Sequence, residues 1–131
     1  MNKKIVIIGM ILIVIAVILG AFGAHALKER LPIEKLTSFE AGVRYQMYNG
    51  IALLVLGFNV DKMNFSLKWP FRILIIGVLF FSVSIYFLAI QPLLGVSLKF
   101  FGPVTPFGGV LMITAWMIII FRLLNDRQIS S

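Results

Sequence analysis

The chain has 131 residues, of which 60% are hydrophobic and only 13% are charged, and its net charge is +7. Soluble domains hold about 45–50% apolar and about 25% charged residues, and a domain of this size buries too little surface to hide such an excess. The composition therefore excludes an ordinary soluble fold and indicates that the bilayer surrounds most of the chain. Because no soluble stretch carries a basic stripe with interleaved aromatic residues, the positive charge indicates lipid-facing loops and not nucleic-acid binding.

Four long apolar runs follow one another along the chain and predict four transmembrane helices. Each run is close to the ~20 residues that cross ~30 Å of hydrocarbon, and a helix satisfies every backbone polar group within its own segment. We therefore predict an all-α, integral membrane four-helix bundle that forms a single domain over residues 1–131. The predicted spans are residues 5–27, 41–60, 71–90 and 106–124.

The connector between the first two spans, residues 28–40, has its own pattern. Ile33, Leu36 and Phe39 recur every three residues, with charged and hydroxyl residues between them. This spacing predicts a short interfacial amphipathic helix that leads into the second span.

Basic residues set the expected orientation, because loops rich in lysine and arginine stay in the cytoplasm. The side that holds both termini collects more of them than the opposite side, and Arg44 lies near the border. We therefore expect a multi-pass protein of the bacterial cytoplasmic (inner) membrane with both termini in the cytoplasm, where anionic lipid headgroups meet the basic loops. The residues on the terminal side are Lys3, Lys4, Lys62, Lys68, Arg72, Arg122 and Arg127, and those on the opposite side are Lys28, Arg30, Lys35 and Lys99.

The first apolar run also admits a second interpretation. Lys3 and Lys4, the apolar stretch and then Ala24, His25 and Ala26 resemble a secretory signal with an A-x-A cleavage site. The run is longer than the roughly 7–15 apolar residues of a signal. This favours a first helix that is retained, and cleavage stays open as the alternative.

Small residues recur within the predicted spans and predict close helix packing, because glycine and alanine allow two helix backbones to approach. Trp116 lies near the middle of the fourth span, where we expect it to pack inward and its indole N–H to need an acceptor. The residues predicted to pack helices together are Ala16, Gly20, Gly23, Ala24, Gly50, Gly57, Gly108, Gly109 and Trp116.

Polar residues gather at one membrane face in the predicted topology, and this face is predicted to be the outer one. Arg44 keeps its charge and must find acceptors or water at membrane depth, and Glu40 lies four residues before it as one acceptor. We therefore predict one hydrogen-bonded cluster near the outer face, closed over by the start of the fourth span. Such a cluster either locks helices together or binds a ligand. Its predicted members are His25, Glu40, Arg44, Gln46, Asn49 and Thr105.

The chain lacks the residue sets of common enzymes. It has no cysteine and a single histidine, His25, whereas a zinc site needs about four ligands. No Gly-x-Ser-x-Gly elbow and no pair of catalytic groups is present. We therefore expect no enzyme activity, no metal and no cofactor.

Three motifs form a recognisable set: residues 20–27, residues 39–48 and residues 102–109. In this order they resemble the small bacterial membrane proteins of domain-of-unknown-function family 423, a family related to a small eukaryotic transmembrane protein. The likeness covers nearly the whole chain. It implies a four-helix inner-membrane protein without an assigned activity.

The chain departs from this family at three positions. Members often carry histidine where this chain has Asn49, and glycine where it has Val83 and Ala115. The absence of a second histidine weakens the idea of a paired-histidine metal or haem site in this chain.

Two functions remain open from the sequence. The first is a non-enzymatic membrane module that binds a lipid, a membrane protein partner or a second copy of itself, as the glycine-rich faces suggest. The second is a passage for a small solute or ion through a polar cavity in the outer half. No acidic residue lies deep in a predicted span, which weighs against proton-coupled transport.

Overall fold

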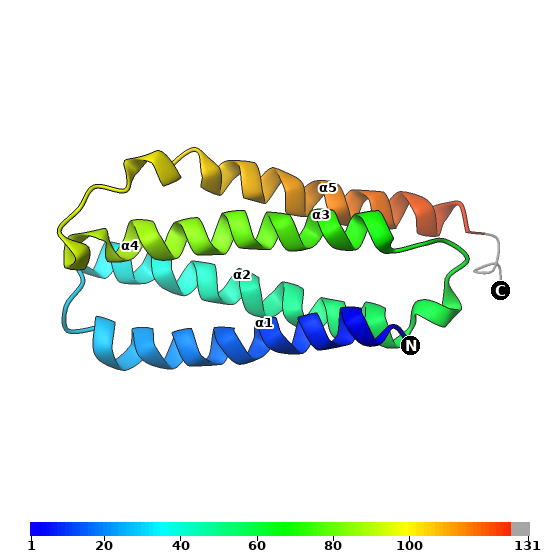
Figure 1. Ribbon diagram of the computed structural model, residues 1–131, viewed down its shortest axis with the longest axis horizontal. Helices are drawn as coiled ribbons and strands as arrows, with labels where there is room; N and C mark the ends of the chain where they lie inside the picture. Colours follow the sequence, from blue (N-terminus) through cyan, green and yellow to red (C-terminus); the bar gives the residue numbers. More distant parts are fainter. Residues whose placement is uncertain (127–131) are drawn as a thin grey trace.

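The computed structural model describes residues 1–126 and is all-helical over that range (Figure 1). Four long helical rods follow one another in the chain, and short 3₁₀ turns lie in two of the connectors. The first rod consists of α1 (Lys3–Phe22) and the π-helical turn η1 (Gly23–Leu27), and the second rod is α2 (Ile33–Phe58). The third rod consists of α3 (Lys68–Val78), the π-helical turn η3 (Leu79–Val83) and α4 (Ser84–Leu94), and the fourth rod is α5 (Val104–Leu124). The 3₁₀ turns are η2 (Val60–Lys62) and η4 (Lys99–Phe101).

Three segments of these rods are long and apolar enough to cross a membrane by length and composition: Lys3–Leu27, Lys68–Leu94 and Lys99–Leu124. Three of the four predicted spans therefore have membrane-capable helices in the described residues. The remaining rod, α2, is 26 residues long but carries four charged side chains in its first half. Polar side chains, Gln46 and Asn49 as well as the charged ones, lower the mean hydropathy of α2, and its length does not separate it from the other three.

The separate interfacial helix predicted within residues 28–40 is wrong. Helix α2 runs without a break from Ile33 to Phe58, so the amphipathic segment forms its first two turns. Pro32 lies directly before the helix, and no proline or turn sequence follows that would end the segment near Glu40. The apolar face of these turns packs inward: Phe39 is 2% exposed, and its ring lies 5.0 Å from the ring of Tyr86 in α4.

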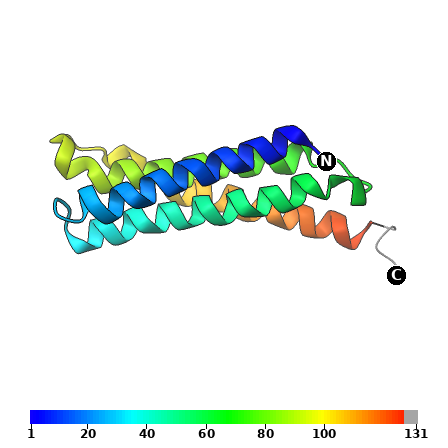
Figure 2. The same ribbon diagram turned by 90° about the horizontal axis from the view of Figure 1, so that it is seen from below.

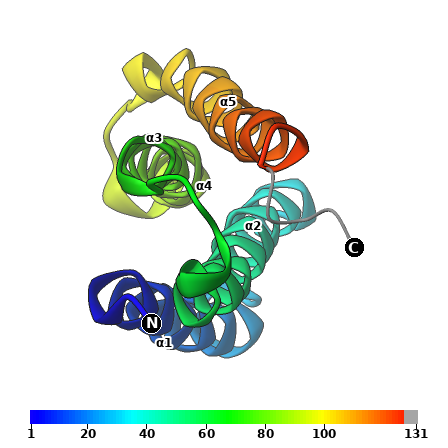
Figure 3. The same cartoon turned by 90° about the vertical axis from the view of Figure 1, so that its right-hand side faces the viewer.

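The rods lie side by side and alternate in direction, so the start of α1 and the end of α5 are at the same end of the molecule (Figures 1 and 2). Seen along the rods, α1 lies against α2, and α5 lies against the rod formed by α3 and α4 (Figure 3). Helix α2 also packs on η3 and α4 and thereby joins the two pairs.

The apolar core lies mainly toward the end that holds the termini, and all four rods contribute to it. It consists of Ile5, Leu12, Leu53, Leu67, Phe71, Leu74, Val78, Met112, Ala115 and Ile119. A smaller cluster closes the opposite end and consists of Leu27, Leu31, Leu36, Phe39 and Ala89.

Each helix pair contains one point where the two backbones nearly touch. In the first pair, a Cβ added to Gly50 would lie 3.0 Å from the carbonyl oxygen of Gly9. In the second pair, a Cβ added to Gly108 would lie 2.4 Å from the backbone nitrogen of Phe81 and 2.8 Å from the carbonyl oxygen of Gly77. Glycine is required at these crossings because any side chain would push the backbones apart.

The small residues of the first span do not all face α2. Ala16 is 1% exposed, and a Cβ on Gly23 would lie 3.1 Å from the ring of Phe39, whereas Ala24 is exposed. A step of four residues turns the helix by about 400°, so Ala24 has drifted about 80° around the helix from Ala16. Gly23 lies seven residues after Ala16 and has drifted only about 20°.

The other small residues predicted to pack helices differ in how closely they do so. A Cβ on Gly57 would lie 2.7 Å from a methyl group of Val6, which is a close approach between α2 and α1. A Cβ on Gly20 or Gly109 would meet its nearest neighbour at 3.5 or 3.7 Å, which is an ordinary contact distance. These two positions therefore leave room for a methyl group.

Candidate functional site: a polar seam and a lateral cleft

Gln46 lies at the middle of α2 and connects three rods. Its Nε2 donates a hydrogen bond to the carbonyl oxygen of Leu12 in α1, at 2.9 Å. Its Oε1 accepts a hydrogen bond from the hydroxyl of Tyr86 in α4, at 2.7 Å. The side chain is 4% exposed, so these bonds lie in an apolar interior, where an amide without partners would be costly.

Asn49 follows on the same face of α2 and connects it to the fourth rod. Its Nδ2 donates to the carbonyl oxygen of Tyr45 at 2.7 Å and lies 3.6 Å from the sulfur of Met112. Its Oδ1 accepts a hydrogen bond from the indole Nε1 of Trp116, at 3.0 Å. This is the acceptor that a mid-span tryptophan requires.

Two buried serines of the third rod complete the set. Ser82 donates to the carbonyl oxygen of Gly42 at 2.8 Å, and the hydroxyls of Ser84 and Thr105 lie 2.6 Å apart. Within residues 1–126 every buried side-chain nitrogen or oxygen has a hydrogen-bond partner. We call these side chains the polar seam: Gln46, Asn49, Ser82, Ser84, Tyr86, Thr105 and Trp116.

The six residues predicted as one cluster are separated in the structure. Gln46, Asn49 and Thr105 belong to the polar seam, but no hydrogen bond joins any two of the six predicted members among the described residues. The predicted convergence into one hydrogen-bonded cluster is therefore wrong. Whether any of these residues binds a ligand stays a prediction.

The side chains of His25, Glu40 and Arg44 are exposed. Arg44 lies two residues before Gln46, so it points about 200° away from the buried face of α2. Because α2 begins at Ile33, Gln46 lies near mid-helix and not near the outer end, as the predicted span from residue 41 implied. His25 lines a separate cavity of about 400 Å³ with Glu29, Arg30 and Leu93.

A cleft of about 510 Å³ opens sideways between α2 and α5, next to the polar seam. Rings of Tyr45, Tyr48, Phe81 and Trp116 form much of its wall, and Tyr45 packs edge-on against Phe81 with their centroids 5.2 Å apart. We call this space the lateral cleft. Its lining residues are Tyr45, Tyr48, Asn49, Ala52, Phe81, Gly109, Met112, Ile113 and Trp116.

The hydroxyls of Tyr45 and Tyr48 make no hydrogen bond within the described residues, although both tyrosines line the cleft. These two side chains are 44% and 57% exposed, so the hydroxyls are accessible from the surroundings. The lateral cleft therefore offers two hydrogen-bond donors beside aromatic walls. A ligand with an apolar body and an acceptor oxygen matches this lining.

The predicted cluster did not include Tyr45, Tyr48 or Tyr86. A predicted span that begins at residue 41 places Tyr45 close to the interfacial belt, where tyrosines of membrane helices concentrate, whereas Tyr45 and Tyr48 lie near the middle of α2 in the structure. Their spacing of three residues also places them on one helix face. That Tyr86 reaches Gln46 depends on how α4 packs on α2, which sequence spacing does not give.

Residues 19–109 match the model of a family described as "Protein of unknown function (DUF423)". The chain is 36% identical over 123 residues to a UPF0382 membrane protein of Staphylococcus epidermidis, covering 94% of this chain and 97% of the relative. It is 35% identical over 120 residues to the UPF0382 membrane protein YwdK of Bacillus subtilis, covering 90% and 94%. No solved structure matches.

These matches extend over most of this chain and most of each relative, and the resemblance carried by the three motifs is confirmed. The chain belongs to the DUF423 family of membrane proteins, whose function is unknown.

Proposed function

We propose that this protein is a non-enzymatic, multi-pass module of the bacterial cytoplasmic membrane that binds an amphiphilic lipid in the lateral cleft. The observation that carries the proposal is that the hydroxyls of Tyr45 and Tyr48, at the mouth of an aromatic cleft, have no hydrogen-bond partner within residues 1–126. The ligand class is a molecule with a hydrocarbon body and an ester or carbonyl oxygen.

The proposal places α2 across the membrane together with the other three rods, as one four-helix bundle. Helix α2 runs alongside the whole of the first rod: Gly57 approaches Val6 near one end, and Phe39 approaches Gly23 near the other. A rod that follows a membrane-spanning neighbour over this length crosses the same thickness of lipid. The exposed charge of Arg44 then extends along its own flexible stem toward the headgroups of the outer face.

The tyrosine hydroxyls supply the argument for a ligand. In hydrocarbon, a hydroxyl without a partner costs about 1–3 kcal/mol, judged from protein mutations. Lipid tails offer no acceptor, and the neighbouring backbone carbonyls of a helix are engaged in its own hydrogen bonds. An ester or carbonyl oxygen within the cleft pairs with these donors, while Phe81 and Trp116 contact the hydrocarbon body.

The engagement of helix carbonyls in their own hydrogen bonds also favours a lipid over a partner helix in the cleft. A transmembrane helix of another protein, or of a second copy, has its carbonyls already bonded within the helix and brings acceptors only on polar side chains. Membrane lipids carry ester oxygens in every molecule. A protein partner is an alternative outcome of the experiments below.

The packing of the core weighs against the alternative function, a passage for solutes. Large apolar side chains from all four rods fill the half of the bundle toward the termini, and Leu53 and Leu74 are at most 1% exposed there. The buried side-chain donors and acceptors of the polar seam at mid-height are paired with one another or with backbone carbonyl oxygens. A polar path to the cytoplasmic side would have to pass through this apolar layer.

Orientation is testable because the chain contains no cysteine. The amino terminus, the connector between α2 and α3, and the end of α5 lie at one end of the rods (Figure 1). That end carries Lys3, Lys4, Lys62, Lys68, Arg72 and Arg122 among the described residues, and Arg127 lies outside them. We propose that this end faces the cytoplasm.

We expect a membrane-impermeant maleimide to label Ser97→Cys in intact cells and to label Ser66→Cys only after the cells are opened. Both serines are exposed and lie at opposite ends of the rods, so the two variants control for each other. Labelling of Ser66→Cys from outside would reverse the proposed orientation.

A quenching experiment tests the lateral cleft. Trp116 lines it and Trp69 does not, so a Trp69→Phe background reports on Trp116 alone. We expect a brominated ester phospholipid, added to the protein in detergent, to quench this fluorescence. Replacing Tyr45 and Tyr48 by phenylalanine removes two hydrogen bonds of about 0.5–1.5 kcal/mol each, so half-quenching should need at least fivefold more lipid.

The matched control is a brominated alkane, which has no acceptor oxygen. Its quenching should be the same for the tyrosine and phenylalanine proteins, because only the aromatic walls hold it. Unchanged quenching by the ester lipid in the double phenylalanine variant would refute the role of the hydroxyls. Complete protection of Trp116 from both probes would point to a protein occupant.

A further inference from the structure

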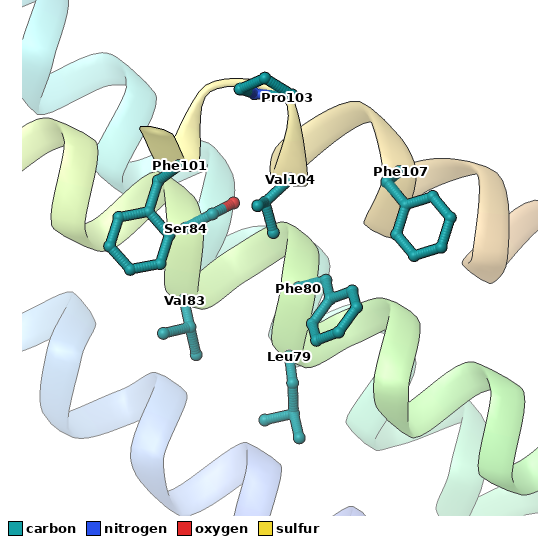
Figure 4. A pocket seen from close by; sticks show the side chains of 8 residues that line it. All are labelled: Leu79, Phe80, Val83, Ser84, Phe101, Pro103, Val104 and Phe107. Carbon is teal, nitrogen blue, oxygen red and sulfur yellow. The ribbon is translucent and has the colours of Figure 1, made fainter. Parts of the chain in front are cut away.

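A second concave surface lies on the other side of the fourth rod, away from the lateral cleft. It has a volume of about 740 Å³ and runs between the third rod and the start of α5, and its lining side chains are shown in Figure 4. We call it the apolar groove. Its apolar lining consists of Leu79, Phe80, Val83, Phe101, Pro103, Val104 and Phe107.

The wall of the apolar groove offers no free polar group. Ser84 is its one polar residue, and the hydroxyl of Ser84 is engaged with Thr105 and with the carbonyl oxygen of Phe81. Both walls belong to membrane-capable segments, Lys68–Leu94 and Lys99–Leu124. An apolar space of this kind stays dry, and a hydrocarbon chain is the occupant that matches its lining.

One end of the groove carries a single positive charge. Lys99 is the only charged residue between Arg72 and Arg122, and it opens the turn η4 whose last residue, Phe101, lines the groove. The side chain of Lys99 is exposed and has no ion pair or hydrogen bond within the part of the chain that the structure describes. A negatively charged headgroup complements this ammonium.

The connector that carries Lys99 is held in place by its own contacts. The backbone N–H of Leu98 donates to Oε1 of Gln91 at 2.8 Å, at the end of α4. The rings of Phe87 and Phe101 stack with their centroids 5.3 Å apart and their planes inclined by 10°. These two contacts hold the backbone on either side of Lys99, next to Phe101 in the wall of the groove.

We infer that the apolar groove and Lys99 together form a second lipid site, which takes an anionic glycerophospholipid. One acyl chain lies along the apolar lining of the groove, beside the contacting rings of Phe80 and Phe107, and the phosphate of the headgroup pairs with the Lys99 ammonium. The charge complementarity selects the lipid class, because an apolar groove alone accepts the tails of any lipid. This site is separate from the lateral cleft and does not depend on the function proposed for it.

The test is a competition between phosphatidylglycerol and phosphatidylcholine with identical acyl chains, present in equal amounts in mixed micelles with the full chain. Native mass spectrometry then counts each lipid bound to the protein. One lysine at a membrane surface corresponds to a roughly fivefold preference for the anionic lipid. With the lateral cleft obstructed by Ala52→Phe in both proteins, we expect the ratio of bound phosphatidylglycerol to phosphatidylcholine to fall about fivefold in Lys99→Gln.

Two further variants separate the site from general charge and from general surface. Lys62→Gln removes an exposed lysine at the opposite end of the rods and should leave the preference unchanged. Val83→Trp fills the groove and should lower the bound phosphatidylglycerol at least threefold, whereas Ile120→Trp, on the exposed face of α5 outside the groove, should not. Equal losses in Lys62→Gln and Lys99→Gln, or a ratio that is unchanged in Lys99→Gln, would overturn the inference. Ala52→Phe obstructs only the lateral cleft, so the lipid that remains bound to this variant is the lipid of the apolar groove.

Discussion

Replacing Gly108 by alanine is expected to destabilise the protein, whereas the same replacement at Gly109 is not. A methyl group on Gly108 would lie 2.4 Å from the backbone nitrogen of Phe81, and a backbone cannot rotate away as a side chain can. The third and fourth rods must therefore separate. Forcing a methyl group into a packed contact costs typically about 1–3 kcal/mol, and a backbone clash should lie at the upper end or above it.

Gly109 is the matched control. A methyl group there would meet the ring of Phe81 at 3.7 Å, an ordinary contact, and alanine favours a helix over glycine by up to about 1 kcal/mol. Gly109→Ala should thus leave stability unchanged or raise it slightly. The measurement is the free energy of unfolding in mixed micelles of mild and denaturing detergent. Equal effects of the two replacements would mean that the α3–α5 crossing is looser than described.

The second large effect is expected at the bond between Gln46 and Tyr86. Gln46→Leu removes the acceptor of the Tyr86 hydroxyl, and the unsatisfied hydroxyl should lower the free energy of unfolding by about 1–3 kcal/mol. In Gln46→Leu/Tyr86→Phe both partners are apolar, so the double replacement should cost less than the sum of the two single ones. The expected coupling is about 0.6 kcal/mol and at most about 1.7 kcal/mol, the average and the maximum found for hydrogen bonds between membrane helices.

The control for this double-mutant cycle is Thr114, whose hydroxyl donates only to the carbonyl oxygen of Val110 in its own helix. Thr114→Val together with Gln46→Leu should be additive, because the two sites share no partner. Additive costs for Gln46 and Tyr86 as well would show that their bond contributes nothing to the packing of α2 on α4.

The sequence allowed the broad architecture to be predicted because lipid imposes few alternatives. A run of about 20 apolar residues is readable without knowledge of its neighbours, and the rod from Lys3 to Leu27 lies within a few residues of its predicted span. The start of α2 was harder to predict. Its first turns bury Leu36 and Phe39 against α4, so a segment with charges on its outer face extends the helix.

The candidate site was less accessible to sequence reasoning, and the physical cause is rotation around a helix. Arg44 and Gln46 are neighbours in sequence but point in nearly opposite directions, and the charged residue faces outward. Gln46 shares the buried face of α2 with Gly42 and Gly50 at four-residue spacing, and Asn49 lies on the same face. This spacing can be read from the sequence. The lateral cleft depends on how far α2 and α5 diverge, and no spacing within one helix encodes that distance.

The central claim is that the lateral cleft holds a lipid. The most direct test is native mass spectrometry of the protein released from its own membranes in mild detergent, compared with Ala52→Phe, in which the added ring projects into the cleft. With the apolar groove filled by Val83→Trp in every protein compared, we expect a bound species with the mass of a membrane lipid, reduced at least fivefold by Ala52→Phe and unaffected by Ile120→Trp. A protein that carries no bound small molecule, or one whose bound lipid is unchanged by Ala52→Phe, would contradict it.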